Sequence, residues 1–346
     1  MVSSDRREYH TGRWPRLFQS TPPEVLAPTD SATRLITMTQ TNPSPLAART
    51  EHSCAAFSRC LRIDAHQHFW QYTPEEFDWI DDAMAHIRRD FLPADLAPLL
   101  RSTGVDTTVA VQARQSLLET EWLLAQADAH DWICGVIGWL PLASPDFPQL
   151  LERHAAHPAF CGLRHVLQAE PPSFFEDASF HHGLQQMQSC ASSRRNLVYD
   201  LLIVEHQMEQ AIHLVDRHPN QIFVLDHLAK PRIASGQLEP WARHLRDLAS
   251  RPHLVCKLSG MVTEADYHRW SIDDLRPYVE IALEAFGPSR LLFGSDWPVC
   301  TVAADYNLWF QAVQEMIASC SESEQEAILG GNAARVYQIG PLDARP

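Results

Sequence analysis

The feature that most constrains the fold is a regular alternation, from residue 61 onward, of short apolar runs with longer segments of helical character. In segments such as 120–131, 206–219 and 277–287, apolar residues recur at three- and four-residue steps, the period of an amphipathic helix. The apolar runs lie at residues 61–66, 107–112, 133–140, 160–167, 197–203, 221–227, 253–260 and 290–296. Eight alternations of strand and helix predict a (β/α)8 TIM barrel. A doubly wound open sheet is the alternative, but no glycine-rich phosphate loop follows the first run.

Residues 1–60 differ from the rest of the chain. They are rich in Ser, Thr, Pro and Arg and show no sustained period. A segment of this kind buries too little apolar surface to offset the entropy lost on ordering. We therefore expect a disordered leader, or an over-extended start, since Met38 could begin a shorter chain. Residues 61–346 are expected to form one barrel domain.

Charge and cysteine usage narrow the class of protein. A formal net charge of −15 at pH 7 argues against nucleic acid or an anionic membrane surface as a partner. The eight cysteines are scattered without a Cys-x-x-Cys pair, which favours a reducing compartment. The longest apolar stretch, residues 132–143, is too short to span a bilayer, and the start of the chain lacks a basic-then-apolar signal layout. These features predict a cytoplasmic protein.

Polar side chains end most of the apolar runs. They are His66 and His68, Gln112, Arg164 and His165, Asp200, Asp226 and His227, Lys257 and Ser259, and Asp296. In a parallel barrel the carboxyl ends of all strands open at one mouth, so these side chains are expected to share one cleft. His66 and His68 are two residues apart, which in a strand places both on one face with Cβ atoms roughly 6–7 Å apart. By the same alternation, only one of Arg164 and His165 can face the mouth.

Six motifs carry a resemblance to a known family. They are IDAHQHFW (63–70), LRHVLQ (163–168), YDLL (199–202), FVLDHLAKP (223–231), CKLSG (256–260) and LLFGSDWPVC (291–300). Together they resemble the amidohydrolase superfamily, in the branch that contains sugar-acid lactonases such as L-fuconolactonase and L-rhamnonolactonase and lactonases of aromatic breakdown. The resemblance runs from about residue 61 to residue 340. It implies a hydrolase of carbohydrate metabolism that opens a cyclic ester.

The resemblance also implies roles for single residues. The first-strand His-x-His of the superfamily matches His66 and His68, the sixth-strand histidine matches His227, and the eighth-strand aspartate matches Asp296. Metal-dependent members commonly add a histidine on strand five, where this chain offers Asp200. We therefore expect no obligatory metal. One divalent ion such as Zn²⁺, held by His66, His68 and Asp296, is the open option.

Opening a lactone requires an activated water, a stabilised oxyanion and a proton for the leaving oxygen. Asp296 is the candidate that takes the proton from water and returns it to the alkoxide. An ordinary aspartate has a pKa of about 3.9, so burial or a neighbouring like charge, such as Asp200, would have to raise it. Without a metal, His66, His68, His227 and Lys257 would donate hydrogen bonds to the oxyanion, each worth about 10²–10³ in rate.

The expected substrate is a small neutral lactone. Candidate substrate contacts are Gln112, Arg164, His165, Asp200, Ser259, Trp70 and Trp297, although the two tryptophans are equally suited to core packing. Arg114 and Arg164 are the obvious arginines at the mouth, too few for a dicarboxylate, which favours a sugar lactone. The alternatives are a lactonase of aromatic-degradation products, a metal-dependent aromatic-acid decarboxylase and a non-catalytic binding barrel. Homodimers are common among such barrels, so a homodimer is one option for the assembly.

Overall fold

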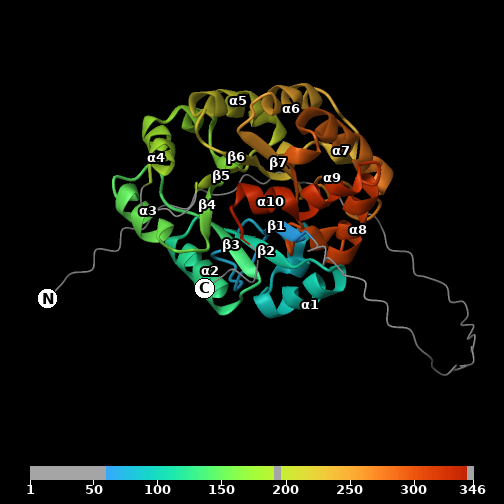
Figure 1. Ribbon diagram of the computed structural model, residues 1–346, viewed down its shortest axis with the longest axis horizontal. Helices are drawn as coiled ribbons and strands as arrows, with labels where there is room; N and C mark the ends of the chain where they lie inside the picture. Colours follow the sequence, from blue (N-terminus) through green and yellow to red (C-terminus); the bar gives the residue numbers. More distant parts are fainter. Residues whose placement is uncertain (1–59, 191–195, 341–346) are drawn as a thin grey trace, which may run out of the picture. The chain divides into compact units, whose positions relative to one another are not determined.

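The eight predicted strands form one parallel sheet that curves into a barrel (Figure 1). The computed structural model describes residues 60–190 and 196–340, so nearly all of the predicted leader lies outside the described residues. The strands are β1 (Ile63–Gln67), β2 (Thr107–Val111), β3 (Ile133–Gly138), β4 (Phe160–His165), β5 (Val198–Leu201), β6 (Phe223–Leu225), β7 (Leu254–Leu258) and β8 (Leu291–Phe293). Each strand pairs with the next in sequence order. The predicted barrel is confirmed.

The first and last strands meet at their carboxyl ends. Gln67 forms a parallel bridge with Trp297. The backbone N–H of His68 donates to the carbonyl of Trp297 at 2.7 Å, and the N–H of Asp296 donates to the carbonyl of His66 at 2.7 Å. These bonds tie the segment after β8 directly to the His-x-His motif.

Helices follow the strands and surround the sheet (Figure 1). They are α1 (Pro93–Thr103), α2 (Leu117–Ala129), α3 (Phe147–Ala155), α4 (Ala178–Gln188), α5 (Met208–Arg217), α6 (Trp241–Ala249), α7 (Ile272–Phe286), α8 (Tyr306–Met316), α9 (Glu322–Glu326) and α10 (Asn332–Val336). Local signals set their limits: the Ser116 side chain accepts from the Glu119 N–H where α2 begins, and Gly104 ends α1 in the left-handed conformation. No helix among the described residues is both long and apolar enough to cross a lipid bilayer.

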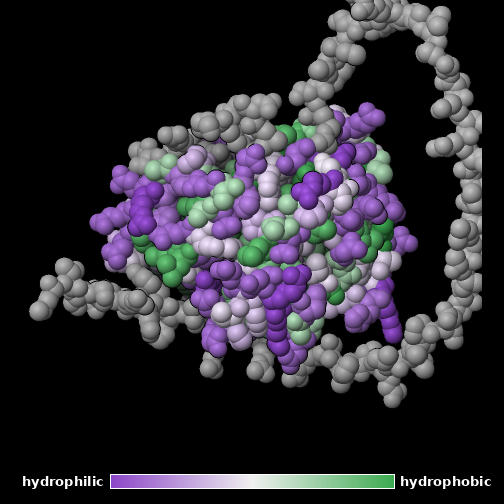
Figure 2. All heavy atoms as spheres, turned by 90° about the horizontal axis from the view of Figure 1, so that it is seen from below, coloured by the Kyte–Doolittle hydropathy of each residue, from purple (hydrophilic) through white to green (hydrophobic). Residues whose placement is uncertain are grey.

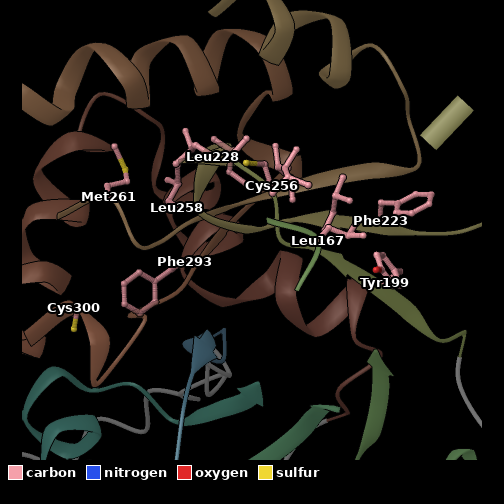
Figure 3. Close-up of a cluster of buried hydrophobic side chains, with 14 of the residues drawn as sticks. Leu167, Tyr199, Phe223, Leu228, Cys256, Leu258, Met261, Phe293 and Cys300 are labelled. Carbon is pink, nitrogen blue, oxygen red and sulfur yellow. The ribbon is translucent and has the colours of Figure 1, made fainter. Parts of the chain in front are cut away.

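Two hydrophobic layers hold the barrel. The outer layer packs the strands against the helices, and Figure 3 shows part of it, with Tyr199 and Phe223 near Leu167 on one side and Leu258 near Leu228 at the centre. The inner layer fills the barrel with small apolar side chains, namely Ile63, Val109, Val198, Val224, Val255 and Leu292. On the face of the molecule in Figure 2, by contrast, hydrophilic residues predominate.

Helix α10 closes the end of the barrel where the strands begin, and Figure 1 shows it at the centre of the ring of strands. Its Asn332 amide donates to the carbonyls of Pro288 and Leu291 at 2.8 Å, at the start of β8. Val336 and the adjacent Tyr337 join the inner apolar layer. With this end sealed, the polar side chains at the opposite strand ends face the mouth that remains.

A buried histidine pair joins α4 to the end of α5. His181 Nδ1 lies 2.7 Å from His218 Nε2, and His181 Nε2 lies 2.9 Å from the Phe175 carbonyl. Because a carbonyl only accepts, His181 carries its hydrogen on Nε2, and His218 donates to its Nδ1. Burial, followed by the charges of His181 and Arg217, lowers the pKa of His218 from 6.5 to about 4. The folded pair is therefore neutral at pH 7.

This pair predicts a loss of stability in mild acid. Between pH 6.5 and about 4 the unfolded chain protonates His218 while the folded chain does not, so the free energy of unfolding falls as the pH falls. A His218→Gln variant lacks this contribution. Urea denaturation of both proteins at pH 7.5 and pH 5 should show that the advantage of the wild type shrinks on acidification. An advantage of constant size would contradict the prediction.

Candidate active site

His66 and His68 leave β1 on the same side and converge, as predicted. The register of β1 against β2 shifts between Asp64 and Gln67, an irregularity of the kind that re-aims side chains at barrel rims. Beyond the shift, the two Nε2 atoms lie 3.1 Å apart, with the ring planes at 81°. Both imidazoles are buried.

One carboxylate oxygen lies among three imidazoles. Asp296 Oδ1 is 3.3 Å from His68 Nε2, 3.7 Å from His66 Nε2 and 3.9 Å from His227 Nε2. We call these four residues the mouth cluster. They come from β1 and the residue directly after it, and from the segments after β6 and β8, so residues 230 positions apart in the chain meet at one point.

Strained backbone positions two members of the mouth cluster. His227 has φ 53° and Asp296 has φ 56°, in the left-handed region that costs a residue with a side chain roughly 1–2 kcal/mol. Such strain is typically retained at functional sites. Gly260 (φ 61°) lies against His227: a Cβ at that position would be 2.4 Å from His227 Nδ1. A glycine is therefore required for the imidazole to fit.

Below the mouth cluster lies a second group of charged side chains, Arg164, Asp200, Asp226 and Lys257, which we call the lower cluster. Lys257 Nζ contacts Asp200 Oδ2, Asp226 Oδ1 at 3.0 Å and His66 Nδ1 at 3.1 Å. Arg164 Nη1 contacts Asp226 Oδ2 at 3.1 Å. All four side chains are buried, and the two cations lie against the two carboxyl groups.

Burial and neighbouring groups set the protonation states of the mouth cluster. Burial lowers the pKa of His66 well below its usual value, lowers the pKa of His68, and lowers the pKa of His227 to about 4. Burial alone would raise the pKa of Asp296, but the imidazoles outweigh it and hold that pKa below its ordinary value. At neutral pH the cluster is an ionised carboxylate among neutral imidazoles. The expected upward shift of the Asp296 pKa is therefore wrong in direction.

Asp200, the residue expected to raise the pKa of Asp296, pairs with Lys257 instead. Asp200 contacts Lys257 in the lower cluster, and its hydroxyl neighbour there is Tyr337 at 3.5 Å. Burial raises the pKa of Asp200 to about 7, against the opposing effect of Lys257. Lys257 itself is fully buried beneath His66. Its contacts therefore suit a residue that positions His66, and they do not extend to a substrate at the mouth.

The remaining predicted contacts divide into two groups. Ser259 Oγ lies 2.9 Å from His227 Nδ1, and the Gln112 amide donates to the Arg164 carbonyl at 3.2 Å, so both support the clusters. His165 points away from Arg164, as the alternation predicts: it stacks on Phe174 and contacts Glu170 at 2.8 Å.

Both tryptophans are core residues. Trp70 is 1% exposed and packs against Phe77 and Phe91, and Trp297 is 3% exposed and packs against Phe69 and Phe91. The sequence allowed the two tryptophans either to stack on a sugar or to pack in the core, and in this structure they pack in the core.

Asp226 is the one polar strand end to which the sequence assigns no catalytic or substrate-binding role. It bridges Arg164 and Lys257 and lies 3.3 Å from His66 Nδ1. The signal was present in the sequence, because Asp226 ends an apolar run directly before His227.

The mouth cluster fits a zinc ion. Ligand atoms of His66, His227 and Asp296 all lie within 4.8 Å of one another. His68 Nδ1 faces the Val111 carbonyl at 2.8 Å, so it carries the hydrogen and leaves the Nε2 lone pair directed at the cluster. A second possible group, His66 with Asp200 and Asp226, surrounds Lys257 Nζ, so a side-chain cation already fills it.

Comparison with known proteins extends over the whole barrel. A family model described as amidohydrolase matches residues 63–339. The chain is 42% identical over 300 residues to the L-fucono-1,5-lactonase of Burkholderia multivorans, which covers 82% of this chain and 99% of the relative. It is 36% identical over 284 residues to the L-fucono-1,5-lactonase of Burkholderia ambifaria, covering 81% and 96%. A solved amidohydrolase from Burkholderia multivorans with bound zinc has a TM-score of 0.77 at 40% identity, covering 81% of this chain and 100% of that chain.

Proposed function

Because this chain belongs to the amidohydrolase family, we propose that it is a hydrolase that opens the lactone of a sugar acid to the free acid. The observation that carries the proposal is the convergence of three neutral imidazoles on the ionised Asp296 carboxylate at the mouth of the barrel. The identity of 42% with an L-fucono-1,5-lactonase over 99% of that relative supports a sugar-acid lactone as the substrate class.

The proposed mechanism assigns the proton transfers to Asp296. Its carboxylate removes a proton from water as the water oxygen bonds to the lactone carbonyl carbon. The carbon–oxygen bond of the ring then breaks, and Asp296 returns the proton to the leaving alkoxide. Since the Asp296 pKa is depressed, the residue is fully ionised at neutral pH and acts as a base through its position at the water.

The imidazoles stabilise the oxyanion. If Ser259 donates to His227 Nδ1, then His227 Nε2 carries a hydrogen and can donate to the carbonyl oxygen of the substrate. Lys257 and Asp226 hold His66 from below. A zinc ion held by His66, His68 and Asp296 would supply a Lewis acid that polarises the carbonyl.

The test of the proposed activity is a screen of aldonolactones with a pH indicator, which reports the acid released on ring opening. We expect the protein to accelerate hydrolysis of at least one six-membered aldonolactone. Failure to release acid from any aldonolactone would remove the proposal.

The mouth cluster predicts one zinc ion per chain. Calorimetric titration of zinc into metal-stripped protein should show a stoichiometry of about one, because His66, His68 and Asp296 supply three donor atoms and leave the fourth position of a single tetrahedral ion open. His68→Ala should abolish this binding, and His182→Ala, at an exposed position on α4, should not change it. A stoichiometry of two would show that Lys257 does not exclude a second ion.

The same stripped protein tests whether a metal is obligatory. We expect measurable lactone hydrolysis to remain, because Asp296 and the N–H donor at His227 Nε2 are still in place. Complete loss of turnover that zinc restores would show that the metal is required.

A further inference from the structure

The strained turn after β6 presents a second side chain at the mouth besides His227. Four consecutive residues, His227 to Lys230, have φ between 51° and 59°, and the Lys230 N–H donates to the His227 carbonyl at 2.8 Å. In a turn of three residues, side chains at i and i+3 project on the same side. The middle residues Leu228 and Ala229 are fully buried, whereas the Lys230 side chain is 23% exposed. The turn therefore directs His227 and Lys230 the same way.

A carboxylate from the next strand's loop lies opposite Lys230. Glu264 ends the short 3-10 helix Val262–Glu264 that follows β7, and its side chain is 14% exposed. Burial raises the pKa of Glu264, Lys230 opposes the shift, and the charge of Asp296 adds to it. Glu264 is thus within electrostatic reach of both the mouth cluster and Lys230.

The ammonium and the carboxylate face each other without a direct hydrogen bond. Lys230 Nζ and Glu264 Oε1 are 3.9 Å apart, which is too long for a direct hydrogen bond. An ammonium offers three donors, and a carboxylate accepts only. A hydroxyl is the group that satisfies both at once, because its oxygen accepts from Lys230 while its hydrogen is donated to Glu264. An aliphatic group in the same place would leave two charges desolvated and unpaired.

We propose that Lys230 and Glu264 form a hydroxyl-recognition subsite that selects polyol lactones, in which one substrate hydroxyl bridges the ammonium and the carboxylate. This inference rests on the proposed lactone hydrolysis and specifies what part of the substrate determines selectivity. Hydrogen bonds to charged groups contribute about 1.5–3 kcal/mol, so loss of the contact should lower kcat/KM roughly 10- to 100-fold.

The experiment pairs variants of the protein with variants of the substrate. The kcat/KM values of the wild type, Lys230→Met and Glu264→Gln are measured on the best aldonolactone and on its deoxy analogues, each lacking one hydroxyl. For one analogue, the kcat/KM of the wild type should be roughly 10- to 100-fold lower than for the parent lactone. Both variants should show similar kcat/KM values for this analogue and for the parent lactone. Arg232→Met, which removes an exposed side chain paired with Glu205, is the matched control and should discriminate like the wild type.

The outcomes separate this inference from the proposed function. If the variants lose activity equally on the parent lactone and on every deoxy analogue, the pair is structural and the subsite is disproved. Unchanged discrimination in both variants also disproves it, while leaving lactone hydrolysis intact. A wild type that hydrolyses no lactone overturns the proposed function and the subsite with it.

Discussion

Replacing Asp296 by Asn is expected to lower kcat/KM for lactone hydrolysis by about 10³-fold or more while the fold is retained. Positioned acid–base groups typically contribute about 10²–10⁴ in rate, and Asn keeps the shape of the side chain but cannot take a proton from water. The substitution also removes the charge on which His66, His68 and His227 converge. Steady-state kinetics on the best aldonolactone would measure the loss, and far-ultraviolet circular dichroism would check the fold.

The matched control for this variant is Asp273→Asn. Asp273 is an exposed aspartate that pairs with Arg276 on the surface of α7, so its replacement should leave kcat/KM within about twofold of the wild type. Near-normal turnover of the Asp296 variant would exclude Asp296 as the base and end the proposed mechanism.

Replacing Lys257 by Met is expected to lower the free energy of unfolding by about 3–5 kcal/mol, the usual cost of removing one partner from a buried ion pair. Asp200 and Asp226 would then remain buried against the single charge of Arg164. Urea denaturation followed by tryptophan fluorescence would measure the change. The same variant should lose activity, because His66 also loses its contact with Lys257.

A second substitution makes this prediction specific. Adding Asp200→Asn to Lys257→Met removes one of the two stranded carboxylates, so the double variant should be more stable than the single one. Arg246→Met, which breaks an exposed pair with Glu284, is the surface control and should leave the free energy of unfolding nearly unchanged. If Lys257→Met lowers the free energy of unfolding no more than the surface control does, the lower cluster does not stabilise the barrel interior as described.

Local pattern was sufficient to predict a large part of the structure. The alternation of periods identified all eight strands, since strand and helix differ in how often apolar residues recur along the chain. The sequence also predicted that only one of Arg164 and His165 faces the mouth, because neighbouring residues of a strand point to opposite faces. The polar strand ends led to the mouth cluster for the same reason: the topology of a parallel barrel brings those ends together.

Other features depend on neighbours that no local pattern names. Trp70 and Trp297 are core residues because aromatic side chains from distant segments, including Phe91, cover them. The depth of Lys257 follows from its interior position on β7, where two carboxylates from β5 and the end of β6 meet it. The direction of the Asp296 pKa shift depends on three imidazoles whose distances only the closed barrel sets.

The sequence by itself determined the barrel, the family and the identity of the residues at its mouth, since each of these follows from the local spacing of apolar residues and from short motifs. Only the tertiary structure decided which charges pair, how deeply each one is buried and which pairs stay beyond hydrogen-bond distance, as Lys230 and Glu264 do. The physical reason is that burial and electrostatic interaction depend on separation in space, and side chains that meet at the mouth come from strands scattered along the whole chain.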